Sequence, residues 1–391
     1  MAKILFISDA IVISTGFASV IRPIIQAAYN AGHEVKQIGW CYQGERHVYP
    51  YQIIAPTDFY EDYYGQKITK IICELWKPDI VFTLGDPWMV DWINKIPNRN
   101  TFKHIGYFPI DGVPFPDKWV EVIENMDIPV VYSQFAYDLV KEKMPNKDIR
   151  LILHGINTNA FRPLNKNDII EFKTKFELKD KYIIGCVARN QWRKNLPALF
   201  RAFEEFAKDK DDVVLYYHGA AIDKGWFIQE LIKRYNLAGK FCFNKTIHPN
   251  YGIIQSDLNK IYNMFDVASL CSLGEGFGLP IAEAHSCEIP VLVTNFSACT
   301  ELTVSDQELI DVLDYYTPSN PEKGVPIDYA LVDHKDYVKK LNWFYYNQEE
   351  AKEIGKRGRK YVLEKLDVNL MKNSFNNLFN EVINKKGVEQ N

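Results

Sequence analysis

The sequence predicts an α/β protein made of two doubly wound domains, each with a parallel sheet. Short apolar runs alternate with amphipathic stretches, and this alternation occurs twice, before and after the segment Leu151–Leu164. Strands that alternate with helices favour right-handed crossovers and therefore parallel sheets. A length of 391 residues suits two domains of similar size. Two such domains facing one another would form a central cleft at the carboxyl ends of their strands, where ligands of these sheets bind.

The first domain is expected over residues 1–160. The apolar run Lys3–Ser8 predicts its first strand, which a loop Ser14–Phe17 follows. A helix should come next, because apolar side chains repeat at helical spacing at Ile21, Ile24, Ile25 and Ala28. Pro23 lies among these positions and predicts a late start or a kink of this helix. Further strands are expected after Gly32 and at Ile80–Leu84, His104–Phe108 and Pro129–Tyr132.

The second domain is expected over residues 161–371. Its predicted strands are Tyr182–Val187, Val213–His218, Lys240–Phe243, Val267–Leu270 and Val291–Thr294. Its predicted helices are Asn167–Phe176, Pro197–Lys208, Trp226–Tyr235, Ser256–Met264 and one that begins at Pro280. The charged segment Asp336–Lys385 should also be helical, and from about residue 372 to 391 we expect it to return to the first domain.

Composition excludes several classes of protein. Hydrophobic residues make up 47% and charged residues 25%, which rules out wholesale disorder. The 46 basic and 50 acidic residues give a net charge of −4, whereas a protein that grips nucleic acid through its phosphates is normally basic, so nucleic acid is not an expected partner. The seven scattered cysteines form neither a disulfide framework nor a zinc motif. No apolar run reaches the roughly 20 residues of a membrane span.

The expected location is therefore the cytoplasm. Basic aromatic helices near Trp343 and Lys356–Lys360 could lie on the inner membrane face, so peripheral membrane contact is the most that we expect. A solvated helix face is the alternative for the same residues.

The most informative stretch is Ser272–Ala284, which holds three glycines at 274, 276 and 278. Their backbone can approach a ligand closely. Pro280 suits the first position of a helix, whose free N–H groups form a ready anion site. Glu275 lies in this loop and Glu283 in the first helical turn. The helix dipole alone could explain Glu283, but two carboxylates beside an anion loop suggest acceptors for sugar and ribose hydroxyls.

This stretch resembles the signature of retaining, GT-B fold glycosyltransferases of family 4 (glycosyl transferases group 1). The resemblance rests on two glutamates separated by seven residues, with the glycines and proline between them. Weaker matches follow in order along nearly the whole chain: Gly16, Ala31–Val35, His154–Pro163, Val187–Asn195 and Tyr217–Gly219. The resemblance implies two Rossmann-like domains around a central cleft, with the nucleotide-sugar donor in the second and the acceptor over the first.

The resemblance also implies roles for particular side chains. Glu275 would bind hydroxyls of the donor sugar and Glu283 the ribose hydroxyls. Arg189 and Lys194 would neutralise the diphosphate, which agrees with the general value of fixed cations where a leaving group gains charge. Arg193 is the nearest rival for either cation, and a solvated loop is the alternative for both. Further donor contacts are expected from Gly16, Gly276, Phe277, Gly278 and Leu279.

Two further predictions leave alternatives open. Nucleobase contacts are expected at Thr246, Ile247 and His248, although His248 is equally typical of an ordinary surface histidine. Many relatives have a histidine after a strand of the first domain, where this chain offers Asp111. Asp111 would orient the sugar or acceptor or act as a base, but an aspartate before glycine is also an ordinary turn former.

The expected function is transfer of a hexosyl group from a UDP- or GDP-linked sugar to an acceptor hydroxyl, with retention of anomeric configuration. The acceptor would be a glycan, a lipid-linked sugar or another hydroxyl compound. No metal is expected, because arginine and lysine supply the positive charge. The alternatives are a GT-B fold epimerase or phosphorylase and a non-catalytic nucleotide-sugar-binding protein. A dehydrogenase or P-loop hydrolase is disfavoured, because the motifs GxGxxG after the first strand and GxxxxGK[ST] are absent.

Overall fold

The computed structural model describes the chain except for residues 59, 245–246, 249–250, 319–324 and 390–391. The chain divides into two compact units. The first comprises Met1–Gly155, a short segment ending at Ile327, and the chain from Val368 onwards. The second comprises Ile156–Pro318 and Asp328–Asp367. The two main divisions, after residues 155 and 367, lie five and four residues before the limits of 160 and 371 expected from the sequence.

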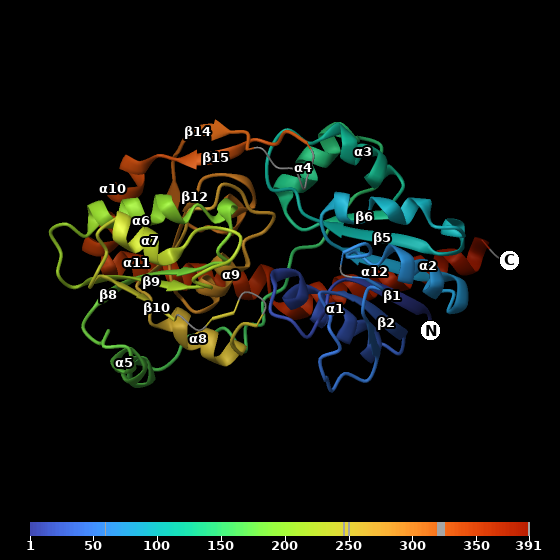
Figure 1. Ribbon diagram of the computed structural model, residues 1–391, viewed down its shortest axis with the longest axis horizontal. Helices are drawn as coiled ribbons and strands as arrows, with labels where there is room; N and C mark the ends of the chain where they lie inside the picture. The colour runs from blue at the N-terminus through green and yellow to red at the C-terminus, as the bar shows by residue number, and fades with distance from the viewer. Residues whose placement is uncertain (59, 245–246, 249–250, 319–324, 390–391) are drawn as a thin grey trace. The chain divides into compact units, whose positions relative to one another are not determined.

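A seven-stranded parallel sheet forms the centre of the first unit (Figure 1). Its strand order is β3-β2-β1-β4-β5-β6-β7. The strands are β1 Lys3–Asp9, β2 Glu34–Trp40, β3 Gln52–Ile54, β4 Ile80–Leu84, β5 Lys103–Phe108, β6 Ile128–Val131 and β7 Arg150–Leu151. The helices are α1 Gly16–Asn30, α2 Gln66–Leu75, α3 Asp117–Glu124, α4 Gln134–Lys143 and α12 Val368–Glu389. The doubly wound class is confirmed for this unit.

Of the two outcomes expected at Pro23, a late helix start or a kink, the late start is wrong. Helix α1 begins at Gly16 and contains Pro23 in its interior. The Thr15 side chain caps it by accepting a hydrogen bond from the backbone N–H of Ala18 at 3.2 Å. This cap satisfies a free donor at the helix start, and the apolar face buries side chains such as Ile21. Capping and burial together therefore outweigh the hydrogen bond that proline removes.

Helix α12 packs in the first unit, as expected for the C-terminal helix, but it begins at Val368, four residues before the expected start at 372. The fully buried rings of Phe375 and Phe379 lie against Phe82, with ring centroids 5.3 and 6.0 Å away. Phe379 also meets Phe6 of β1 at 6.0 Å. The last helix in the sequence thus completes the core of the first sheet.

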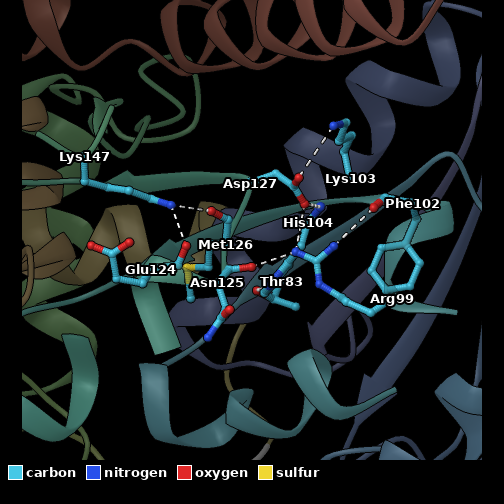
Figure 2. Close-up of polar contacts among 10 residues, drawn as sticks. All are labelled: Thr83, Arg99, Phe102, Lys103, His104, Glu124, Asn125, Met126, Asp127 and Lys147. Atoms are coloured by element: carbon cyan, nitrogen blue, oxygen red, sulfur yellow. Dashed lines mark hydrogen bonds and ion pairs between the residues drawn. The ribbon is translucent and has the colours of Figure 1, made fainter. Parts of the chain in front are cut away.

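Polar side chains tie together the amino ends of β5 and β6 (Figure 2). Arg99 Nη2 donates to the carbonyl of Asn125 at 2.7 Å and to Asp127 Oδ2 at 2.8 Å. The backbone N–H of His104 donates to the same carboxylate at 2.8 Å. Burial, followed by the charge of Arg99, lowers the pKa of His104 to about 3. Ligands of doubly wound sheets bind at the carboxyl ends of the strands. This cluster lies at the amino ends, so we interpret it as structural and not as part of the expected site.

The second unit is built on a six-stranded parallel sheet of order β10-β9-β8-β11-β12-β13, with a separate antiparallel hairpin β14-β15. Its strands are β8 Tyr182–Val187, β9 Val213–His218, β10 Phe241–Phe243, β11 Val267–Leu270, β12 Val291–Thr294, β13 Leu309–Ile310, β14 Val312–Tyr316 and β15 Tyr329–Val332. Its helices are α5 Lys166–Lys175, α6 Leu196–Phe206, α7 Ile228–Arg234, α8 Gln255–Asn263, α9 Leu279–Ser286, α10 His334–Tyr346 and α11 Gln348–Lys365.

Helix α9 packs on α11, and α10 packs on α6. Within the residues that the structure describes, every helix is too short or too polar to serve as a transmembrane segment.

Candidate functional site

The switch point of the second sheet lies between β8 and β11, where the strand order reverses direction. In open α/β sheets, this is where ligands bind, outside the carboxyl ends of the strands. The segments that leave these strands contact each other: the backbone N–H of Leu273 donates to the carbonyl of Arg193 at 2.8 Å. Cys271 Sγ donates to the carbonyl of Asn195 at 3.4 Å. The fold therefore joins two motifs that are about 80 residues apart in sequence.

Glu275 lies at the centre of this junction and is buried. Its Oε2 accepts a hydrogen bond from Arg193 Nη1 at 2.8 Å, and its Oε1 pairs with the ammonium of Lys194. Ser272 Oγ donates to the same Oε1 at 2.6 Å. Arg193 Nη1 also donates to the carbonyl of Gly274 at 2.7 Å. Two cations and one carboxylate thus form a compact, hydrogen-bonded cluster.

The charges in this cluster hold Glu275 in its ionised form. Burial alone raises the pKa of Glu275, but the charges of Arg193 and Lys194, together with hydrogen bonds from Lys194 and Ser272, outweigh it and lower the pKa to about 2. Burial lowers the pKa of Lys194, while the carboxylate of Glu275 acts in the opposite direction. With both cations protonated, the cluster carries one net positive charge.

The backbone around Glu275 is fixed by hydroxyl groups and by one glycine. The N–H of Glu275 donates to Ser297 Oγ at 2.9 Å, and Thr294 Oγ1 donates to the carbonyl of Ser272 at 2.7 Å. Gly278 precedes α9 with φ of 103°, and a Cβ there would lie 2.8 Å from Cδ1 of Ile281. The loop can turn into the helix at this point because glycine tolerates both constraints.

Arg189 does not share the Glu275 cluster in this structure. Its Nε donates to Asp223 Oδ2 at 2.7 Å and its Nη2 donates to Asp223 Oδ1 at 3.4 Å. Arg193, which the sequence offered only as a rival, contacts Glu275 instead. All five charged side chains nevertheless come from neighbouring segments of this sheet. Arg189, Arg193 and Lys194 follow β8, Glu275 follows β11, and Asp223 lies in the β9–α7 loop.

Glu283 differs from its expected setting in two respects. It is the fifth residue of α9, because that helix begins at Leu279, so it lies beyond the first turn. Tyr262 Oη donates to Glu283 Oε2 at 2.7 Å. Burial nevertheless raises the pKa of Glu283 to about 7, so the helix dipole is not the dominant influence on this carboxyl group.

The donor-binding residues predicted around α9 lie together. Gly276 is half-buried, and Phe277 and Gly278 are buried in the loop that carries Glu275. Leu279 is half-buried and begins α9. These residues therefore connect the Glu275 cluster to the helix start.

The remaining predicted residues are more dispersed. Ile247 is half-buried and His248 is exposed after β10, with the His248 ring 4.9 Å from that of Tyr251. Thr246 lies outside the described residues. Gly16 is the exposed first residue of α1, and Asp111 is buried in the loop after β5, so both belong to the first unit.

Reasoning from the sequence missed three partners of the predicted residues. Ser272 lies inside the glycine-rich motif and could have been noticed as a donor next to Glu275. Tyr262 and Asp223 come from other elements, and no spacing pattern points to them. In the described part of the chain, no group of three or more His, Cys, Asp or Glu side chains could hold a metal ion.

Comparison with known proteins finds sequence similarity mainly in the second unit. Residues 168–361 match the family model described as Glycosyl transferases group 1. A curated relative, a probable sucrose-phosphate synthase of Thermosipho melanesiensis, is 28% identical over 176 residues, or 44% of this chain and 38% of that protein. The matches to three curated relatives span 38 to 59% of those proteins' lengths.

Solved structures extend the likeness to the whole chain. Sucrose-phosphate synthase from Thermosynechococcus elongatus has a TM-score of 0.78 at 18% identity, over 98% of this chain and 100% of that one. HepE of Anabaena, solved in complex with UDP and glucose, has a TM-score of 0.73 at 15% identity, over 97% and 100% of the two chains. At such identities the likeness shows the GT-B fold. The chain has this fold, and residues 168–361, in its second unit, match the family model of Glycosyl transferases group 1.

Proposed function

We propose that the chain is a glycosyltransferase that transfers a hexosyl group from a UDP- or GDP-linked sugar to an acceptor hydroxyl. The proposal includes retention of anomeric configuration and independence from metal ions. The observation that carries it is the buried Glu275 held by Arg193 and Lys194 at the switch point of the sheet whose region matches the family model. The solved complex of the related HepE with UDP and glucose supports a UDP-sugar as the first donor to test.

The charges suit the proposed donor. A departing nucleoside diphosphate accumulates negative charge, and fixed cations in a partly buried site stabilise that charge without reorganisation. Lys194 is buried and Arg193 is half-buried beside it, so both are held in place before any donor binds. Their net positive charge after pairing with Glu275 remains available to the diphosphate.

Glu275 is suited to accept hydrogen bonds from the donor sugar. Its pKa of about 2 keeps it ionised at neutral pH. An ionised carboxylate offers about four acceptor positions. Two donors, Lys194 and Ser272, contact Oε1, whereas among the described residues one donor, Arg193, contacts Oε2. A sugar hydroxyl would use the remaining capacity of Oε2.

Glu283 is proposed to bind the ribose. With a pKa near 7, it is partly protonated in the ligand-free protein at neutral pH. Hydroxyl donors from a ribose would favour its charged form and lower this pKa again. The acceptor is proposed to be a glycan, a lipid-linked sugar or another hydroxyl compound.

The test is to mix the protein with UDP-, GDP- and ADP-sugars and to measure release of nucleoside diphosphate, with and without simple sugar acceptors and after removal of metal ions by a chelator. We expect release from at least one donor and an acceptor product with the anomeric configuration of the donor. An isomerised sugar nucleotide would instead indicate an epimerase, and binding without turnover a non-catalytic protein.

A matched variant connects this activity to the site. Glu275→Gln keeps the size of the side chain and removes its charge, so we expect loss of transfer. Glu353→Gln removes a carboxylate from an exposed pair with Lys356 in α11 and should leave transfer unchanged. Unchanged turnover by Glu275→Gln would contradict the proposed role of Glu275.

A further inference from the structure

The loop between β9 and α7 is hydrogen-bonded to the segment that carries Arg189. The neighbouring Asn190 is fully buried, and its Nδ2 donates to the carbonyl of Trp226 at 2.6 Å and to that of Ala220 at 3.3 Å. Its Oδ1 accepts from the backbone N–H of Trp226 at 2.9 Å. One side chain thus holds both ends of the loop 220–226.

The loop backbone lies so close to Asn190 that residue 225 must be glycine. A Cβ at Gly225 would lie 2.2 Å from Asn190 Oδ1 and 3.0 Å from the Asn190 carbonyl. Real Cβ atoms do not approach so closely, so the loop backbone packs directly on Asn190. The position of this loop relative to Arg189 is therefore determined by packing as well as by hydrogen bonds.

Asp223 lies in this loop, and its carboxylate accepts hydrogen bonds from one edge of the Arg189 guanidinium. The Asp223 side chain is only 6% exposed, whereas that of Arg189 is 35% exposed. Arg189 uses Nε and Nη2 for its two hydrogen bonds to the carboxylate. A guanidinium has five N–H donors in a rigid plane, so two on Nη1 and one on Nη2 are not used by Asp223. One N–H of Nη1 and one of Nη2 point side by side from its outer edge.

We propose that Asp223 is a positioning residue that presents the outer edge of Arg189 to the diphosphate of the nucleotide-sugar donor. This inference rests on the proposed function and deepens it. The outer edge of a guanidinium matches two phosphate oxygens with parallel hydrogen bonds. Because Asp223 fixes the plane of the guanidinium in advance, little side-chain freedom is lost when the diphosphate binds.

A carboxylate beside an arginine also cancels its charge, which would weaken attraction for an anion. The two effects have opposite signs, so a substitution distinguishes them. If positioning dominates, removing Asp223 weakens diphosphate binding; if cancellation dominates, it strengthens binding. Asp223→Ala should fold, because Arg189 is partly exposed and remains hydrated without its partner.

The experiment is calorimetric titration of the purified full chain with UDP and with GDP, and a competition assay with the parent nucleosides uridine and guanosine. For Asp223→Ala we expect about a tenfold weaker affinity for the diphosphate, since an arginine fork must then be ordered on binding. Nucleoside affinity should not change. Asp223→Asn keeps one hydrogen-bond acceptor for Arg189, so its affinity for the diphosphate should lie between those of the wild type and Asp223→Ala.

Control variants separate this role from general effects. Glu230→Ala removes a carboxylate from an exposed pair with Lys233 in α7, directly after the loop, and should leave binding unchanged. If Asp223 acts through Arg189, then Arg189→Ala/Asp223→Ala should bind the diphosphate no more weakly than Arg189→Ala. The double variant also avoids leaving the buried Asp223 carboxylate unpaired, so it should fold even if the single arginine variant does not.

Three results would overturn the positioning role. The first is unchanged or tighter diphosphate binding by Asp223→Ala, and the second is an equal loss of nucleoside and diphosphate affinity. The third is a further loss of diphosphate affinity when Asp223→Ala is added to Arg189→Ala. If the wild-type protein binds neither UDP nor GDP, the proposed function and the positioning role both fall. If it binds one of them and Asp223→Ala binds it equally well, the positioning role alone falls.

Discussion

Replacing Glu275 by glutamine leaves two cations, Arg193 and Lys194, close together without the carboxylate that they share. Folding lowers the pKa of Glu275 from an ordinary 4.5 to about 2. At 1.36 kcal/mol per unit, this corresponds to about 3 kcal/mol of folding free energy. Removing one partner of a buried ion pair commonly costs about 3–5 kcal/mol. We therefore expect Glu275→Gln to lose about 3–5 kcal/mol of unfolding free energy at pH 7.

The sign of the pH dependence follows from the same pKa. Because folding lowers the pKa of Glu275, its contribution is fully present above pH 4.5 and is lost as the pH falls towards 2. Urea unfolding followed by tryptophan fluorescence, at pH 7 and at steps below 4.5, measures this directly. The difference between wild type and Glu275→Gln should shrink as the pH falls.

Two control variants make the stability test specific. Adding Lys194→Met to Glu275→Gln removes the buried, uncompensated ammonium and should recover most of the loss. Glu353→Gln, in an exposed pair, should change stability by less than about 0.5 kcal/mol. A broken buried ion pair should cost far more than about 1 kcal/mol. If the unfolding free energies of Glu275→Gln and wild type at pH 7 differ by less than that, Glu275 is not held in a buried ion pair.

Other substitutions test further parts of the structure. Folding raises the pKa of Glu283 from 4.5 to about 7, so wild type should lose stability as the pH rises through that range. Glu283→Gln should not, and in urea unfolding at pH 8 it should be more stable than wild type by up to about 3 kcal/mol; equal stabilities there would argue against a buried carboxyl. Gly278→Ala, at φ of 103°, should lower the unfolding free energy by about 1–2 kcal/mol, and an unchanged melting temperature would contradict that backbone conformation. Phe375→Ala should cost about 3–5 kcal/mol; a cost below about 1 kcal/mol in the same assay would mean that α12 does not complete the first core.

The strands of the second sheet were predictable because buried parallel strands are continuous apolar runs with clear ends. Four of them, Tyr182–Val187, Val213–His218, Val267–Leu270 and Val291–Thr294, match the structure to the residue. The hairpin β14-β15 was not predicted, because its exposed residues, such as Leu313 and Tyr315, follow neither a helical period nor an alternating pattern of burial.

The side chains that the structure brings together around Glu275 were predictable in residue type and only partly in pairing. Glycines, proline and two glutamates at a fixed spacing point to Glu275, and the basic segment after β8 points to Lys194. The sequence could not show that Arg193, and not Arg189, contacts Glu275, because Arg189 pairs with Asp223, which comes from a loop 34 residues away. Nor could it give the pKa of Glu283, because burial in the folded unit determines that value.

We propose that the segments at the carboxyl ends of β8 and β11 bind the diphosphate of a nucleotide sugar. The most direct measurement is a crystal structure of the full chain with whichever of UDP and GDP binds more tightly. We expect diphosphate oxygens within hydrogen-bond distance of Lys194 and Arg189, with Glu283 at the ribose. A well-defined nucleotide whose phosphates lie away from both cations would contradict it.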